Sequence, residues 1–243
     1  AARRVGSDWP KSTFRKPCRL AFIAPAVCSN RGGGGLRDSF SAGREWRTND
    51  LMNNRAAVIF DLDGTLTKPY LDFDAIRREL GIAQGPILEA LAQMDAPARR
   101  EAEAVLLRHE WEAAENAPVY DGAVATVAAC RAKGHPVAIL TRNARAVVDY
   151  VLEKHGFVVD AIRTREDGAI KPSAEPVLSL CRQLNASPSR SWMVGDYLFD
   201  ILSGKAAGTR TVLMIGDGVP PDYAGKADFV IRQPCELLAV IGV

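Results

Sequence analysis

The stretch AAVIFDLDGTLT, residues 56–67, decides the fold of this chain. Its first five residues are apolar and include β-branched side chains, which predicts a short buried strand that the turn at Gly64 ends at once. Side chains alternate along a strand, so Asp61 and Asp63 should point toward one small volume while Leu62 points into the core. Two carboxylates so close together need a cation, a proton or a chemical task, unless they only cap an acidic turn.

The composition indicates one globular core with an appendage. The chain has 243 residues, of which 47% are apolar and 25% are charged, and this length is sufficient for one substantial core. No apolar run is long enough for a transmembrane helix. The five cysteines are widely spaced and contain no CxxC pair. They indicate a reducing compartment, and we predict a cytoplasmic protein without disulfides or a zinc site.

Positive charge is concentrated in residues 1–51. This segment holds ten Lys and Arg against four Asp and Glu, a balance of +6, whereas the remainder holds 21 against 25, a balance of −4. The remainder therefore offers no basic field for nucleic acid. We predict that neither nucleic acid nor a membrane is a partner of the folded part.

Residues 1–51 show no sustained hydrophobic period, and such a segment cannot bury enough apolar surface to fold alone. Two interpretations remain open. The segment is an organellar transit peptide, which would place the protein in a chloroplast or mitochondrion, or it is an extension that does not belong to the mature protein. The second interpretation rests on Met52, which is the first methionine. A nucleic-acid-binding arm is disfavoured because few aromatic residues lie among the basic ones.

A helical insertion is predicted after Thr67. Asp72 is a typical N-cap residue, and Pro86 and Pro97 are typical of the first turn of a helix. The last of the predicted helices is apolar on two opposite sides, which indicates contact with two bodies. We predict a small α-helical cap over residues 68–118, with helices at 73–80, 87–94 and 97–116.

From Pro118 onward the pattern alternates between helices and strands. Repeated βα units predict a parallel sheet with right-handed crossovers and helices on both faces, a Rossmann-like doubly wound α/β fold. The core should then comprise residues 52–67 and 119–243. The predicted strands are 136–140, 161–162, 192–194, 211–214 and 229–231, and the predicted helices are 122–133, 144–155, 173–184, 198–207 and a terminal one.

Two of the loops between these elements contain groups that suit a bound anion. Thr141 closes the second predicted strand, and its hydroxyl with the N–H groups of Arg142 and Asn143 would form an anion cradle at a helix N-terminus. Lys171 precedes Pro172, which favours an extended backbone and so fixes the direction of the lysine stem. Taken alone, Thr141 is more typical of an ordinary helix N-cap.

Acidic residues follow a further strand. Gly195 gives access to the backbone, Asp196 lies at the strand end, and Asp200 lies four residues on, in the first turn of a helix. The ends of parallel strands are where open α/β sheets bind ligands. More carboxylates at this edge require a hard cation, and Mg²⁺ prefers oxygen ligands.

These stretches together suit phosphoryl transfer to an aspartate, which needs a divalent metal, a lysine, N–H donors and an acid for the leaving group. The chain contains four motifs in sequence: DxDGTLT, a threonine at a strand end, Lys-Pro and GDxxxD. Their order resembles that of the haloacid dehalogenase (HAD) superfamily. The likeness is to its small-molecule phosphatases with a helical cap after the first motif, and it extends over about residues 56–243.

The resemblance implies catalytic roles for four residues. Asp61 would be the nucleophile that becomes an aspartyl-phosphate, and Asp63 would be the general acid and base. Thr141 and Lys171 would bind the phosphoryl group.

The resemblance also implies a Mg²⁺ cofactor, with Asp61, the backbone carbonyl of Asp63 and Asp196 as ligands and Asp200 supporting them. The predicted substrate-binding residues are Gly64, Thr65, Thr141, Arg142, Asn143 and Lys171, of which Gly64 and Thr65 shape the turn.

The chain departs from the family at two points. Dehalogenases of the family lack an acid at the position of Asp63, so this residue favours phosphate chemistry. Many relatives with a cap continue DGTLxDS, whereas this chain has Thr67-Lys68-Pro69-Tyr70. The cap of about fifty residues is small for a mutase, which must exclude water from a bisphosphorylated intermediate.

We therefore predict a Mg²⁺-dependent phosphatase acting on a small phosphorylated metabolite, as a monomer or homodimer. A phosphosugar mutase is the enzymatic alternative. A non-catalytic binding protein on the same fold is the alternative from another class, and it is disfavoured because all four motifs are intact.

Overall fold

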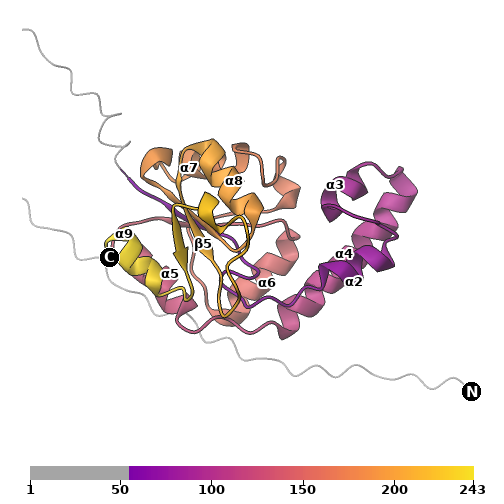
Figure 1. Cartoon of the computed structure of the whole chain (residues 1–243), viewed down its shortest axis with the longest axis horizontal. Coiled ribbons are helices and arrows are strands. Elements are labelled where there is room, and N and C mark those ends of the chain that lie inside the picture. The colour runs from indigo at the N-terminus through magenta and orange to yellow at the C-terminus, as the bar shows by residue number, and fades with distance from the viewer. Residues whose placement is uncertain (1–54) are drawn as a thin grey trace, which may run out of the picture. The chain divides into compact units, whose positions relative to one another are not determined.

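The computed structural model describes residues 55–243, and the predicted segment of residues 1–51 lies outside them. A parallel sheet of six strands has the order β3-β2-β1-β4-β5-β6 (Figure 1). The order reverses between β1 and β4, as in a doubly wound Rossmann-like sheet, which confirms the predicted fold class. The strands are β1 (Val58–Phe60), β2 (Val137–Leu140), β3 (Ala161–Arg163), β4 (Trp192–Gly195), β5 (Arg210–Met214) and β6 (Phe229–Ile231).

Helices cover both faces of this sheet, so its central strand is buried on both sides. Val58 and Phe60 pack in one apolar cluster with residues of α5, α6 and α9, whereas Ile59 packs in a second cluster with residues of α7 and α8. This alternation follows from the period of two along a strand. Figure 1 shows α7 and α8 on the opposite side of the sheet from α5 and α9. The helices of the core are α5 (Ala123–Ala132), α6 (Arg145–His155), α7 (Glu175–Gln183), α8 (Leu198–Ala207) and α9 (Glu236–Ile241), with short 3-10 helices η1 (Arg165–Asp167), η2 (Pro188–Arg190) and η3 (Ala224–Lys226).

The predicted site residues follow strands that end at one edge of the sheet. Asp61 follows β1, Thr141 follows β2, and Asp196 follows β4. The strands are parallel, so these three ends meet at the edge where ligands bind in such sheets. The N–H group of Asp61 donates to the carbonyl of Val194 at 2.8 Å, which ties the end of β1 to the end of β4.

The three helices within residues 68–118, a segment that we call the cap, form where the sequence predicts them. The Asp72 carboxylate accepts a hydrogen bond from the N–H group of Ala75 at 2.8 Å, as expected for an N-cap. Asp95 caps the third helix in the same way, through the N–H group of Ala98 at 2.9 Å. The three helices are α2 (Phe73–Glu79), α3 (Ile87–Ala92) and α4 (Ala96–Asn116).

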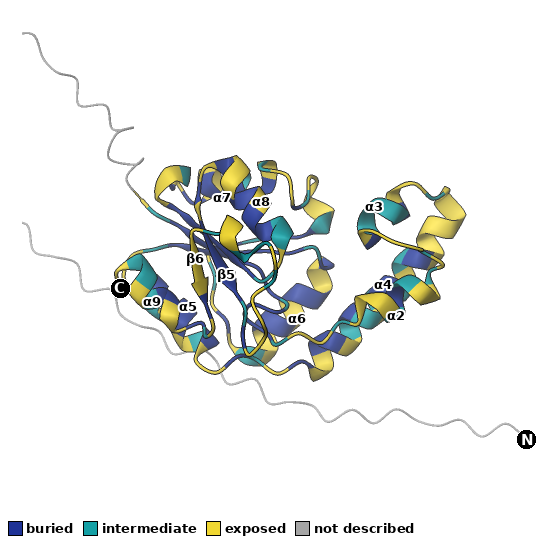
Figure 2. Ribbon diagram, viewed as in Figure 1, coloured by how far each residue is buried: buried dark blue, intermediate teal, exposed yellow. Residues whose placement is uncertain are grey.

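Helix α4 belongs to two separate apolar clusters, and Figure 2 shows buried positions along much of its length. Leu106 packs with the cap cluster, which consists of buried residues of α2, α3 and α4. Trp111 and Ala114 pack instead with the larger core cluster under α5 and α6. The prediction that this helix contacts two bodies is confirmed.

The two connections between the cap and the core run side by side. Thr67 and Val119 form an isolated antiparallel bridge. The N–H group of Lys68 donates to the carbonyl of Pro118 at 2.7 Å, and the N–H group of Tyr120 donates to the carbonyl of Leu66 at 3.0 Å. The chain therefore leaves and re-enters the core at one place.

Within residues 55–243, no helix is both long and apolar enough to cross a bilayer. The predicted compartment, the predicted absence of nucleic acid and the predicted oligomeric state stay predictions.

Because the cap cluster is separate from the core clusters, we predict that a substitution in it destabilises the cap helices and leaves the stability of the sheet unchanged. Leu91 is buried in this cluster, and its replacement by alanine should cost about 2 to 5 kcal/mol. Hydrogen exchange of the Leu91→Ala variant should accelerate at amides of α2 and α3 and stay unchanged in β1 and β4. Leu88→Ala removes a partly buried side chain from the same helix and should have a smaller effect. Equal acceleration in α3 and β1 would show instead that cap and core unfold as one unit.

Candidate active site

Three carboxylates converge at the edge of the sheet beside β1 and β4. Asp61, Asp196 and Asp200 each place an oxygen within 4.8 Å of the others. Asp61 and Asp200 are buried, and Asp196 is half-buried. Carboxylate oxygens in such a group are the ligands that Mg²⁺ prefers. The structure thus brings together three of the four predicted metal residues through their side chains.

The ammonium group of Lys171 lies between two of these carboxylates. Its Nζ is 2.7 Å from Oδ1 of Asp61 and 2.6 Å from Oδ1 of Asp200, and the side chain is 3% exposed. Burial alone would lower the pKa of Lys171, but the carboxylates of Asp200 and Asp61 outweigh it and raise that pKa. Lys171 is therefore charged.

One ammonium does not balance three carboxylates. Burial, followed by repulsion from Asp61 and Asp200, raises the pKa of Asp196 well above its usual range. Burial also raises the pKa of Asp200 to about 6, although Lys171 acts against this shift. A divalent cation at the three carboxylates would remove this excess of negative charge. The donor set and its charge both fit Mg²⁺.

Two glycines let these carboxylates approach the backbone. Gly64 has a φ of +75°, and a Cβ at this position would lie 2.1 Å from Oδ2 of Asp196. A Cβ at Gly195 would lie 2.1 Å from Cγ of Asp200. The sequence predicted a turn at Gly64, and the structure adds a second reason for glycine, because Asp196 occupies the space of a side chain. The adjacent Thr65 is 2% exposed, and its hydroxyl has no hydrogen-bond partner among the described residues.

The side chain of Asp63 is not part of the group of three carboxylates and has its own hydrogen-bond partners. The amide Nδ2 of Asn143 donates to its Oδ2 at 2.5 Å, and the hydroxyl of Thr67 donates to its Oδ1 at 3.4 Å. Burial, with a smaller contribution from Asp61, raises the pKa of Asp63 to about 7, against the hydrogen bond from Asn143. Asp61 and Asp63 thus have different surroundings although one residue separates them.

The loop after β2 differs from the predicted anion cradle. The N–H group of Asn143 donates to the hydroxyl of Thr141 at 3.2 Å, so this donor is used within the protein. Helix α6 begins only at Arg145. The N–H group of Ala144 also has a protein acceptor, Oε2 of Glu110 at 3.2 Å. The anion cradle stays a prediction, and the side chain of Asn143, also predicted to bind substrate, contacts Asp63.

The guanidinium of Arg142 joins the core to the cap. It donates to both carboxylate oxygens of Glu89 on α3, at 3.0 and 2.5 Å, and to the carbonyl of Lys171 at 2.7 Å. It also lies over the ring of Phe199, 5.0 Å from the ring centre. Sequence reasoning named Arg142 for its N–H group and missed this role of its side chain.

Glu110 was also missed by sequence reasoning, although it is 2% exposed and reaches the loop after β2. A signal for it exists in the sequence. Glu110 lies four residues after Leu106 and three before Ala113, so it falls on an apolar side of the predicted helix. A charge in that position needs a buried partner.

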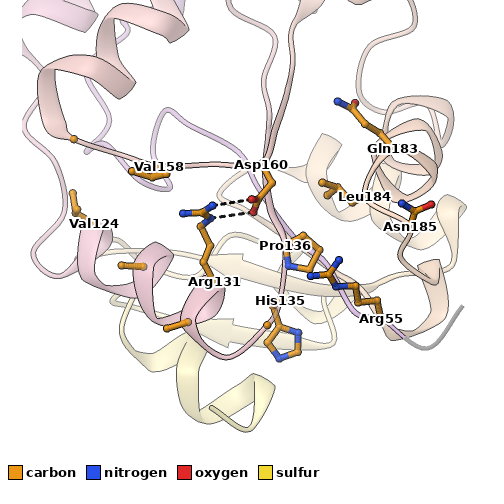
Figure 3. A pocket seen from close by; sticks show the side chains of 14 residues that line it. Arg55, Val124, Arg131, His135, Pro136, Val158, Asp160, Gln183, Leu184 and Asn185 are labelled. Atoms are coloured by element: carbon orange, nitrogen blue, oxygen red, sulfur yellow. Dashed lines mark hydrogen bonds and ion pairs between the residues drawn. The ribbon is translucent and has the colours of Figure 1, made fainter. Parts of the chain in front are cut away.

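Two hollows differ in their position on the sheet. One of about 210 Å³ adjoins Gly64 and Asp196 and is lined by Tyr120 and Tyr223. The other, of about 710 Å³, adjoins residues that precede β1 and β2, at the opposite edge (Figure 3). Figure 3 shows its ion pair of Arg131 with Asp160, whose N–O distances are 2.9 and 3.1 Å. The carboxylate group and Lys171 do not line this second hollow.

Comparison with known families gives one match over more than half of the chain. Residues 72–208 match a family described as haloacid dehalogenase-like hydrolase.

Individual relatives are similar over most of their length. A putative pyrophosphatase PpaX of Clostridium perfringens is 29% identical over 214 residues, which cover 76% of this chain and 96% of the relative. An N-acetylmuramic acid 6-phosphate phosphatase of Pseudomonas aeruginosa is 31% identical over 218 residues, which cover 76% of this chain and 94% of the relative. Among solved structures, a hydrolase from Pseudomonas syringae has a TM-score of 0.67 and 18% identity over 77% of this chain and 98% of its own. This last likeness supports the fold.

Because Gly64 lies against Asp196, we predict that adding one methyl group at position 64 strongly lowers the free energy of unfolding. Gly64→Ala and Gly81→Ala both place an L-residue at positive φ, which costs about 1 to 2 kcal/mol. A Cβ at Gly81 meets nothing within 4 Å, whereas one at Gly64 meets the Asp196 carboxylate. Urea denaturation should therefore show a larger loss of unfolding free energy for Gly64→Ala than for Gly81→Ala. Equal losses would show that Asp196 moves aside freely.

Proposed function

Because the chain belongs to the haloacid dehalogenase-like hydrolases, we propose that it is a Mg²⁺-dependent phosphatase of small phosphorylated metabolites. One observation carries the proposal most directly. The charged Lys171 contacts Asp61 within a group of three carboxylates at the reversal point of the sheet. The relatives named as phosphatases support the choice of phosphate esters or anhydrides as substrates.

Asp61 would be the nucleophile. Its carboxylate attacks phosphorus, a bond forms between its oxygen and phosphorus, and the bond between phosphorus and the leaving oxygen breaks. Attack of one anion on another requires positive charge nearby, and Lys171 at 2.7 Å from Asp61 supplies it. Thr141 and Lys171 would bind the phosphoryl oxygens.

Asp63 would move the protons. In the first step its carboxylic acid donates a proton to the leaving oxygen, and in the second its carboxylate takes a proton from the water that attacks the aspartyl-phosphate. That water adds to phosphorus, inorganic phosphate leaves, and the Asp61 carboxylate is restored. The hydrogen bond from Asn143 orients the carboxyl group for both transfers.

Asp61 and Asp196 would hold Mg²⁺ through their side chains, together with the backbone carbonyl of Asp63, and Asp200 would support these ligands. The ion would polarise the phosphoryl group as a Lewis acid. Within the chain, Lys171 and the two glycines that adjoin Asp196 and Asp200 keep the three carboxylates together.

We also propose that residues 68–118 are a cap that selects the substrate. The paired connections at Thr67 and Val119 support boundaries at these positions. The ion pair of Arg142 with Glu89 brings the cap next to the loop of Lys171. The small size of the cap favours a phosphatase over a phosphosugar mutase, because a mutase intermediate must be shielded from water.

The purified chain should release inorganic phosphate from p-nitrophenyl phosphate when Mg²⁺ is present, and EDTA should stop the release. Asp61→Asn should lower kcat by about a thousandfold or more, because the nucleophile is lost. Asp149→Asn changes a half-exposed aspartate on α6 and is the matched control, with activity close to wild type.

The same assay separates the alternatives. A mutase would return the phosphoryl group to a sugar phosphate, so free phosphate would not accumulate with sugar phosphates as substrates. A wild-type protein inert across a broad panel of phosphate esters would favour the binding protein on the same fold.

Asp63→Asn should separate binding from turnover. The asparagine keeps the size of the side chain but cannot transfer the proton, so kcat should fall about a hundredfold to ten-thousandfold while KM stays within about threefold. Steady-state kinetics with p-nitrophenyl phosphate measure both constants. A rise of KM with unchanged kcat would assign Asp63 to substrate binding instead.

A further inference from the structure

A carboxylate from α4 accepts a hydrogen bond at the N-terminus of α6. Ala144 occupies the N-cap position and offers no side-chain acceptor. The N–H group of Ala144 itself donates to Oε2 of Glu110 on α4 at 3.2 Å, and the next N–H group, that of Arg145, donates to Oε1 of Glu166 at 3.2 Å. A carboxylate at a helix N-terminus is favourable for the dipole as well as for the unpaired donor.

Arg165 completes this arrangement from the start of η1. Its Nη1 forms an ion pair with Oε1 of Glu110 and donates to the carbonyl of Arg142 at 3.2 Å. Its N–H group donates to the carbonyl of Asn143 at 3.4 Å. Glu110 and Arg165 together therefore contact the backbone of residues 142–144.

The loop of residues 142–144 contains Asn143, whose side chain donates a short hydrogen bond to Asp63. Asn143 Nδ2 lies 2.5 Å from Oδ2 of Asp63, and the Asn143 backbone lies between the atoms bound by Glu110 and Arg165. A shift of this loop would therefore lengthen or misalign the contact with Asp63. Misalignment of an acid catalyst by a fraction of an ångström is enough to slow proton transfer.

We propose that Glu110 is a positioning residue for the reaction: with Arg165 it fixes residues 142–144 so that Asn143 aligns Asp63 with the leaving oxygen. The inference rests on the proposed function, since it concerns the step in which Asp63 donates its proton.

The place of Glu110 on α4 gives this contact a second consequence. Leu106, one turn before it, packs in the cap cluster, and Ala114, one turn after it, packs in the core cluster. Glu110 thus lies where the helix passes from the cap to the core. A displacement of α4 would move the Glu110 carboxylate and, through it, the loop of Asn143.

If Glu110 only stabilised the fold, its loss would lower kcat/KM for all substrates by the same factor. If its loss misaligns Asp63, kcat/KM should fall more for substrates with a poor leaving group. Phenol needs protonation more than p-nitrophenol does, and phenyl phosphate and p-nitrophenyl phosphate differ little in shape. The ratio of their kcat/KM values therefore reports on the alignment of Asp63. This constant extends only through the first irreversible step, so hydrolysis of the aspartyl-phosphate does not mask the effect.

The test measures this ratio in the wild-type chain, Glu110→Gln and Arg165→Lys. In Glu110→Gln, kcat/KM for phenyl phosphate should fall about tenfold more than kcat/KM for p-nitrophenyl phosphate, because part of the contribution of the acid is lost. Arg165→Lys keeps the positive charge but loses the planar guanidinium group and its paired N–H donors. It should shift the ratio in the same direction by a smaller factor. Glu79→Gln breaks the ion pairs of α2 with Arg108 and His109 on α4 and should leave the ratio unchanged.

Equal losses with both esters in Glu110→Gln and Arg165→Lys, or no loss in either variant, would overturn the positioning role. Thermal melts of each variant show whether an equal loss comes from unfolding. A wild-type chain inert toward both esters and across the broad panel of phosphate esters would instead overturn the proposed function itself.

Discussion

The buried ammonium of Lys171 between Asp61 and Asp200 is the interaction on which the arrangement of the surrounding loops depends. These three groups come from the loop before α7, the end of β1 and the first turn of α8, and each would be an unpaired buried charge without the others. Leaving one such charge without its partner costs about 3 to 5 kcal/mol. The loops at this edge of the sheet are therefore fixed to one another by charge as well as by packing, with Asp196 adding a negative charge that Lys171 alone does not balance.

Most of the fold follows from local patterns in the sequence. The strands that flank β1 are short and apolar and alternate with helices, of which α6 and α8 end at Gly156 and Gly208, so the repeated βα pattern predicts a doubly wound sheet. The site residues at the strand ends follow from the same pattern, because parallel strands bring Asp61, Thr141 and Asp196 to one edge. The observed helix bounds differ from the predicted ones by no more than a few residues.

The parts that sequence reasoning missed are contacts between distant segments. Glu89 meets Arg142, 53 residues away, and Glu110 meets Ala144, 34 residues away. No local period tells which loop a side chain on a cap helix will reach, since that depends on how α3 and α4 pack against the core. The close approach of Asp196 to Gly64 is likewise invisible in the sequence, where Gly64 indicates only a turn.

The bridge between Thr67 and Val119 has a consequence for how this architecture varies. A segment whose two ends meet at one point can be lengthened, shortened or replaced without moving the strands on either side of it. The strand ends of the sheet and residues 68–118 can then accumulate changes almost independently, as long as their mutual contacts are kept, among them those of Glu89 with Arg142, of Glu110 with Ala144 and of α4 with α6. The fold thereby separates a fixed candidate site at the strand ends from an adjoining segment that can be exchanged.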